Sequence, residues 1–137
     1  MSHFVECRPG FTDLAALVDA LVAVGFERDQ VEVHEQPVAL FGYQGDERPQ
    51  RAHVVIRRQH VGRAANDVGW ERCSDGTIRS WISEFDARHR LDASMQRRIR
   101  QEYACAAVTR QQQSLGRQVE RRMLPDGEIE LQVSGYR

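Results

Sequence analysis

Two short turn sequences restrict the fold of this chain more than any other feature. Ser-Asp-Gly at residues 74–76 and Pro-Asp-Gly at residues 125–127 each stand between two β-rich runs. Turns of this kind join neighbouring antiparallel strands. The sequence therefore predicts two β-hairpins, which argues against a doubly wound parallel sheet. The paired runs are residues 67–73 with 77–82, and residues 117–123 with 128–133.

Helical periodicity is confined to two segments. The first is expected to begin at Thr12 as N-cap and to end at Gly25, and the second to begin at Asp92 or Ser94 and to reach about Gln113. The opposite side of the first helix is rich in alanine, which indicates either a composition bias or a second packed face. The apolar arcs are Leu14, Leu17, Val18, Leu21, Val22 and Val24 in the first helix, and Met95, Ile99, Tyr103, Ala106 and Ala107 in the second.

Four further β-rich runs complete the expected order of elements, which is β-α-β(5)-α-β-β. Because hairpins adjoin one another and only two helices interrupt them, we expect an α+β fold. Its sheet is expected to be mainly antiparallel, with five to seven strands and both helices packed on one face. We expect residues 1–137 to form a single domain. The four runs are residues 3–8, 30–36, 38–43 and 52–59.

Composition excludes several functions. The 137 residues include 19 basic side chains, all of them arginine, and 20 acidic ones. Without lysine the chain cannot be a P-loop NTPase, a Schiff-base enzyme or a Ser-x-x-Lys acyltransferase. Three cysteines do not make a disulfide framework, and no apolar run is long enough to cross a bilayer. We therefore expect a cytoplasmic protein with no membrane partner.

The near-neutral net charge hides an uneven distribution along the chain. Residues 1–56 contain four arginines and nine acidic residues, whereas residues 88–122 contain nine arginines and three acidic residues. Three of those nine, Arg97, Arg98 and Arg100, fall near the start of the second predicted helix. The helix macrodipole disfavours cations there, so another interaction is expected to offset the cost.

Three interpretations of Arg97, Arg98 and Arg100 remain open. They form a solvated face partly paired with Asp92 or Glu102, or they dock on an acidic protein surface, or they bind nucleic acid. The acidic surface could belong to another protein or to a second copy of this chain. We favour protein docking among the functional interpretations, because the segment has few aromatic side chains on which bases could stack.

Trp70 and Trp81 lie on the two arms of the first predicted hairpin. Large aromatic side chains on sheets are usually part of the core. If both were exposed together, they would make an anchor for a protein partner. Trp70 and Trp81 therefore join the three arginines as predicted binding residues.

The residues that could support catalysis or metal binding do not form a recognised motif. The cysteines lie outside any nucleophile elbow, and the histidines lack metal-binding spacing. Glu128 and Glu130 share a strand face beside a turn, which is typical of a solvated strand rather than a glycosidase. No catalytic residue, metal or cofactor is predicted, and a thiol- or metal-dependent enzyme is the third alternative. The residues considered for it are Cys7, Cys73, Cys105, His3, His34 and His53.

The order of several short motifs resembles a family of unknown function, number 1257, from bacteria, cyanobacteria and some plastids. The resemblance covers nearly the whole chain but includes no catalytic motif. It implies an accessory or adaptor protein associated with an AAA-type ATPase system. The sequence thus predicts a non-enzymatic, protein-binding domain, with a nucleic-acid-binding module as the alternative. The motifs are Met-Ser-His-Phe at 1–4, Phe-Gly-Tyr-Gln-Gly at 41–45, Ala-His-Val-Val-Ile at 52–56, Asp-Val-Gly-Trp at 67–70, Tyr-Ala at 103–104, Val108 and Asp-Gly at 126–127.

Overall fold

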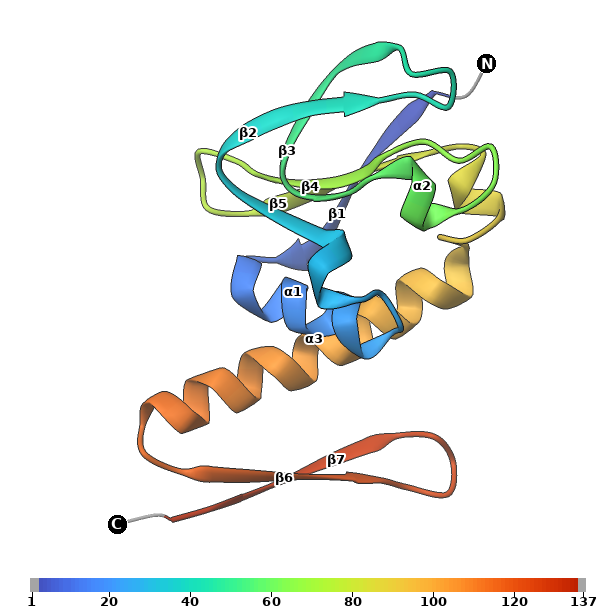
Figure 1. Ribbon diagram of the computed structural model, residues 1–137. Coiled ribbons are helices and arrows are strands. Elements are labelled where there is room, and N and C mark those ends of the chain that lie inside the picture. The colour runs from blue at the N-terminus through green and yellow to red at the C-terminus, as the bar shows by residue number, and fades with distance from the viewer. Residues whose placement is uncertain (1–2, 136–137) are drawn as a thin grey trace.

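A computed structural model describes residues 3–135 of the chain (Figure 1). Among these residues, no helix is both long and apolar enough to cross a membrane. The elements in chain order are β1 (Phe4–Phe11), α1 (Leu14–Ala23), the 3-10 turn η1 (Arg28–Gln30), β2 (Val31–Phe41), β3 (Glu47–Ile56), α2 (Arg58–Val61), β4 (Val68–Arg72), β5 (Ile78–Ser83), the 3-10 turn η2 (Asp86–Arg88), α3 (Ala93–Ser114), β6 (Gln118–Met123) and β7 (Ile129–Ser134).

The predicted α+β fold is confirmed. Five strands form one sheet in the order β1-β5-β4-β3-β2, and every neighbouring pair is antiparallel. Within residues 3–135, the remaining strands, β6 and β7, pair only with each other in a separate two-stranded sheet. Both predicted hairpins are present, and the turn glycines Gly76 and Gly127 have positive φ angles of 87°, which a glycine adopts without strain.

Two predicted strand boundaries were wrong. The segments 30–36 and 38–43 form the single strand β2, so four strands rather than five lie between the two long helices. The register between β2 and β3 shifts between Val33 and Val38, which accommodates the intervening residues as a bulge. The first strand also continues beyond Pro9 to Phe11, because the register with β5 shifts there and Gly10 adopts a φ of +88°.

The helix α1 packs beneath the five-stranded sheet and α3 runs alongside α1 (Figure 1), with Ile99 and Tyr103 of α3 in the same buried cluster as Phe11 and Trp70. The N-cap of α1 is Asp13 rather than Thr12, since the Asp13 carboxylate accepts hydrogen bonds from the backbone N–H groups of Ala15 and Ala16. Ala16 and Ala20 are completely buried, whereas Ala15 and Ala23 are exposed, so only part of the alanine-rich side of α1 is packed. Small side chains allow the two helices to approach closely.

The second face of the sheet is covered by the sheet itself. The outer parts of β2 and β3 arch over it (Figure 1), and Leu40, Ala52 and Val55 form a second buried cluster there. Gly69 on β4 makes this curvature possible. A Cβ atom at Gly69 would lie 2.5 Å from the Cβ of Ala52 and 2.9 Å from Leu40 Cδ2. The apolar side chains of this cluster are therefore covered by the chain itself, with Phe4, Val38 and Trp81 partly buried against them.

The hairpin of β6 and β7 lies on the opposite side of α3 from the five-stranded sheet (Figure 1). It contacts α3 through the ion pair of Arg121 with Glu102, at 2.6 Å, and through the Gln101 amide, which donates to the carbonyl of Gly127. None of the residues in its two strands is buried.

Candidate functional site

The long helix α3 positions the three predicted arginines. Asp92 is its N-cap, and the Asp92 carboxylate accepts a hydrogen bond of 2.9 Å from Met95 N. Ile99 is buried and holds one side of the helix against the core. At about 100° per residue, Arg97, Arg98 and Arg100 occupy an arc of roughly 160° centred away from Ile99. The three guanidinium groups therefore share the exposed side of the first half of α3, here called the arginine face.

The arginine face has no internal counter-charge. Within residues 3–135, Arg97, Arg98 and Arg100 form no hydrogen bond or ion pair. The two carboxylates considered as partners are already engaged, Asp92 in capping and Glu102 with Arg121. The helix begins at Ala93, so these arginines lie beyond its first turn, where the macrodipole penalty is small.

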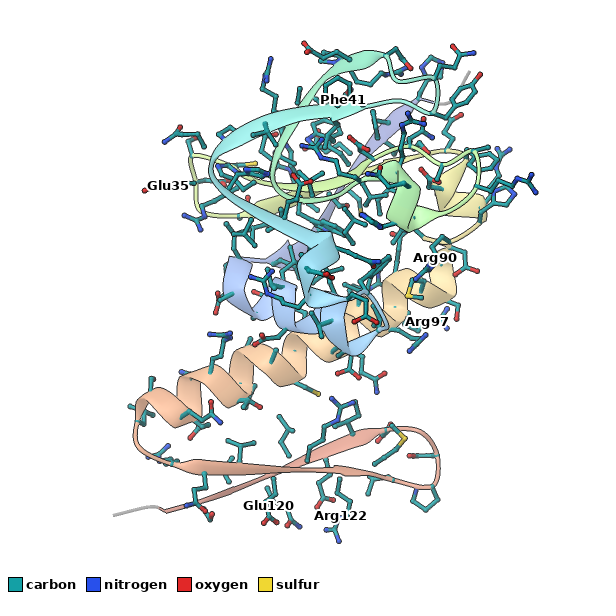
Figure 2. The ribbon with its side chains drawn as sticks, viewed as in Figure 1. Glu35, Phe41, Arg90, Arg97, Glu120 and Arg122 are labelled. Carbon is teal, nitrogen blue, oxygen red and sulfur yellow. The ribbon has the colours of Figure 1, made fainter. Side chains whose placement is uncertain are left out.

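Other arginines of the basic segment behave differently. Arg110 binds Asp19 on α1 at 2.7 Å, and Arg122 binds Glu130 on β7 at 2.8 Å. The Arg110 pair joins α3 to α1, the pair of Arg121 with Glu102 joins the hairpin to α3, and the Arg122 pair joins β6 to β7. The excess of positive charge in residues 88–122 thus divides into a structural part and an unpaired part. Figure 2 shows Arg97 and Arg90 at the same end of α3.

The two tryptophans occupy opposite faces of the sheet. Trp70 is 1% exposed in the core beneath the helices, so it is unavailable to a partner. Trp81 is half-buried on the second face, where its Nε1 donates to Glu71 at 3.2 Å and the Arg79 guanidinium lies 4.8 Å from its ring. The two rings do not form a common anchor, and neither lies on α3.

The three cysteines lie apart from one another, whereas His34 and His53 line the same cleft, described below. Cys7 is exposed, and Cys73 and Cys105 are half-buried. Burial, assisted by the Glu102 carboxylate, raises the pKa of the Cys105 thiol, which makes it a poorer nucleophile. In the described part of the chain, no three residues among His, Cys, Asp and Glu lie close enough together to hold a metal ion.

Sequence reasoning missed a cleft of about 600 Å³ between α1 and the bulged part of β2. Bulges often redirect side chains beside functional sites, but the pairing that creates this one is not visible in the sequence. The cleft has equal numbers of lining arginines and carboxylates. Its charged and imidazole-bearing lining residues are Asp13, Asp19, Arg28, His34, Glu35, His53, Arg72 and Arg110.

His53 is the best-defined polar group of this cleft. Its Nδ1 accepts a hydrogen bond of 3.0 Å from the backbone N–H of Arg72. Burial and the neighbouring Arg72 charge lower the pKa of His53, so the ring is neutral near pH 7 and its proton lies on Nε2. The Arg72 side chain is exposed, and it forms no ion pair with the residues that the structure describes. The cleft is therefore lined by an N–H donor, His53 Nε2, and by the Arg72 guanidinium, a cation with no ion pair among the described residues.

A charged network adjoins the cleft at His34. Arg57 donates to Glu32 and to the buried Asp67, each at 2.9 Å, and His34 contacts Glu32 at 2.8 Å. Burial alone would raise the pKa of Glu32, but the hydrogen bonds from Arg57 and His34 lower it. Asp67 also accepts from the backbone N–H groups of Phe41 and Arg58. These contacts hold β2 and β3 in place and leave the network little capacity for a ligand.

Comparison with family models, with curated proteins and with solved structures gives no match to this chain. The resemblance to family 1257 consequently stays a prediction. The site is defined by its own geometry, as an unpaired cationic helix face and a small polar cleft.

Proposed function

We propose that the protein is a non-enzymatic accessory domain that binds an acidic protein surface through Arg97, Arg98 and Arg100. The observation that carries this proposal is that these three exposed guanidinium groups lack a carboxylate partner within residues 3–135, whereas Arg110, Arg121 and Arg122 each have one. Unpaired arginines on one helical arc provide electrostatic attraction and forked hydrogen-bond donors for carboxylates.

The same surface is less suited to nucleic acid. Tyr103 is the only aromatic residue of α3, and its ring is buried against Phe11 with ring centroids 4.2 Å apart. The Tyr103 hydroxyl also accepts hydrogen bonds from the backbone N–H groups of Thr12 and Asp13. Binding of a single strand usually involves stacking of bases on exposed aromatic rings, and α3 has no such ring among its residues. The resemblance adds the narrower proposal that the partner belongs to an AAA-type ATPase system.

Binding of a labelled Glu-rich peptide tests this function, with a mixed-sequence single-stranded DNA as the competing ligand. Replacing Arg97, Arg98 and Arg100 by Gln should weaken peptide binding at least about tenfold at low salt, because three ion pairs are lost. The charge-matched control replaces Arg8, Arg51 and Arg63 by Gln and should change the affinity less than about twofold. Equal losses in both variants, or tighter binding of the DNA, would contradict the proposal.

We propose a second function for the cleft, the binding of a small anion such as a phosphate or a carboxylate. It rests on the Nε2–H group of His53 and on the Arg72 guanidinium, which has no ion pair within the described residues, since both residues line the cleft. Titration with inorganic phosphate, followed through the imidazole NMR signals of His53, tests it. Saturable shifts that vanish in Arg72→Gln are expected, and shifts that persist unchanged in that variant would overturn the assignment.

A further inference from the structure

The hairpin of β6 and β7 is poorly stabilised within one chain. A two-stranded sheet is marginal in water unless further strands or a well-packed layer support it. Here none of the strand residues is buried, and Met123 is 65% exposed. Both strands also have one free edge, because each pairs only with the other. Two kinds of contact could stabilise the hairpin. Another chain could pair with the free edge of a strand, or a packed layer could bury the apolar side chains.

The two faces of the hairpin have different characters. Opposite residues in an antiparallel pair share a face, so Val119, Val133, Met123 and Ile129 lie together with Arg121 on one face. The bond from Arg121 to Glu102 shows that this face points toward α3. Glu120 and Arg122 lie on the other face, and Figure 2 shows both pointing away from α3.

Hydrogen bonding identifies the groups on the free edge of β6. Leu124 N donates to Glu128 O, so every second residue before Leu124 directs its backbone polar groups toward β7. The N–H and C=O groups of Val119, Arg121 and Met123 consequently point outward from β6. They form a short row of backbone donors and acceptors that is ready to pair with another strand.

We propose that β6 pairs with β6 of a second copy of this chain, antiparallel and centred on Arg121, which creates a four-stranded sheet in the order β7-β6-β6-β7. In this register, Val119 lies opposite Met123 of the other copy, and Glu120 lies opposite Arg122. Symmetry produces each contact twice. The two Arg121 residues face each other across the centre, but each guanidinium is already neutralised by its own Glu102.

Charge complementarity selects β6 rather than β7 for this contact. The equivalent symmetric pairing of β7, centred on Leu131, would place Glu130 opposite Gln132 and would form no ion pair. In the β6 pairing, the Glu120 carboxylate gains Arg122 of the other copy, while that Arg122 keeps its ion pair with Glu130 of its own hairpin. Within the described residues the Glu120 carboxylate accepts no hydrogen bond and interacts only electrostatically, with Arg122 of its own strand. Met123, which is 65% exposed, gains an apolar neighbour on the face that points toward α3.

Sedimentation velocity over a concentration series tests the proposal with the full-length chain. The wild type should form a dimer. Glu120→Arg should raise the dimer dissociation constant about tenfold, because two attractive pairs become repulsive. The triple variant Glu120→Arg/Arg122→Glu/Glu130→Arg restores opposite charges both between the copies and within the hairpin, where Arg122 binds Glu130, and should return to within about threefold of the wild type. Glu128→Arg, with the same charge change at the hairpin turn, should have little effect.

Disulfide trapping tests directly which residues of the two β6 strands lie opposite each other. Its result does not depend on how strongly Glu120→Arg weakens the dimer. In a background with Cys7, Cys73 and Cys105 replaced by Ser, a cysteine replacing Arg121 should form an intermolecular disulfide. Hydrogen-bonded opposite residues have Cα atoms about 5.5 Å apart, which suits a disulfide. A cysteine replacing Glu120 lies off the symmetry centre and should crosslink poorly. A monomeric wild type, or a dimer that is indifferent to Glu120→Arg and does not crosslink at position 121, would overturn the proposal.

Discussion

The five-stranded sheet with its helices and the C-terminal hairpin are stabilised by different forces. All the fully buried large side chains of residues 3–135 belong to the sheet, the helices and their connections, including Trp70, Leu17 and Leu21. The hairpin has none, and its links to α3 are a surface ion pair and an amide hydrogen bond. Burial of a large apolar side chain contributes about 1.5–3 kcal/mol, whereas an exposed ion pair contributes at most about 1 kcal/mol.

The comparison shows that a regular secondary structure does not imply a stable core. The hairpin has the more complete strand register, with six consecutive residue pairs, whereas β2 and β3 are interrupted by a bulge. The free energy of unfolding nevertheless depends mainly on the sheet and α1. Substitutions in the two regions should therefore change the free energy of unfolding by very different amounts.

The largest expected loss of stability comes from a substitution that creates a cavity beneath the sheet. Leu17 on α1 is completely buried, so Leu17→Ala should lower the free energy of unfolding by about 2–5 kcal/mol. Leu131→Ala on β7 removes the same atoms from a half-buried position and should cost less than about 1 kcal/mol in the monomer. Urea denaturation of both variants measures the contrast, and equal losses would show that the hairpin is part of the main core.

Crowding of the second face should have the next largest effect. Gly69→Ala introduces a Cβ atom 2.5 Å from that of Ala52, and such overpacking should cost about 1–3 kcal/mol. Gly62→Ala is the matched control, because nothing lies within 4 Å of the added carbon and the backbone there is extended. Thermal melting of the two variants should differ by several degrees. A Gly69→Ala variant as stable as Gly62→Ala would show that the arch of β2 and β3 moves freely.

A buried carboxyl group should make the stability of the sheet region depend on pH. Asp86 is 1% exposed, and its Oδ2 accepts from Ser83 Oγ at 2.8 Å and from Asn66 N at 3.1 Å. Its Oδ1 has no partner in the structure as described. Burial raises the pKa of Asp86 above its ordinary value of 3.8, despite the hydrogen bonds from Ser83 and Asn66.

Because the pKa of Asp86 is higher in the folded chain than in the unfolded one, the unfolded chain releases the proton first as the pH rises. The stability that the protonated group contributes is fully present below about pH 4 and is lost as the pH rises through the folded pKa. Asp86→Asn mimics the protonated group, so its stability relative to the wild type should increase from pH 4 to pH 7. Urea midpoints at several pH values measure this, and a difference that is constant with pH would contradict it.

The smallest expected effect concerns the contact between α3 and the hairpin. Glu102→Gln weakens the bidentate pair with Arg121 and should lower the free energy of unfolding by less than about 1 kcal/mol, because the Arg121 side chain is 43% exposed. A double-mutant cycle with Arg121→Gln isolates the pair, and amide hydrogen exchange in β6 reports whether the hairpin loosens locally. A coupling energy of several kcal/mol would mean that the hairpin depends on this single contact.

Local sequence predicted the hairpins and the helices well. The turns at residues 74–76 and 125–127 require glycine at a positive φ angle, and this requirement is independent of the rest of the fold. The start of α3 at Asp92 and its end near Gln113 were also predicted, because capping and apolar periodicity are local properties. The excess of arginine in residues 88–122 can likewise be counted directly from the sequence.

The cleft and the two environments of the arginines were not predictable. The cleft depends on a bulge in β2 opposite His53, and a bulge shows only when two strands are aligned. Likewise, residues 88–122 contain three carboxylates for nine arginines. Only the folded chain shows that Arg110 pairs with Asp19, which is far away in the sequence. The opposite faces of Trp70 and Trp81 follow from the register between β4 and β5.

The sequence by itself determined the class of fold, the positions of the turns and the presence of a basic helix, because each of these follows from backbone preferences and periodicity over a few neighbouring residues. The tertiary structure alone decided which tryptophan is buried, which arginines remain unpaired and how β2 and β3 cover the second face of the sheet. These features arise from contacts between residues far apart in the chain, and such contacts depend on the geometry of the whole sheet.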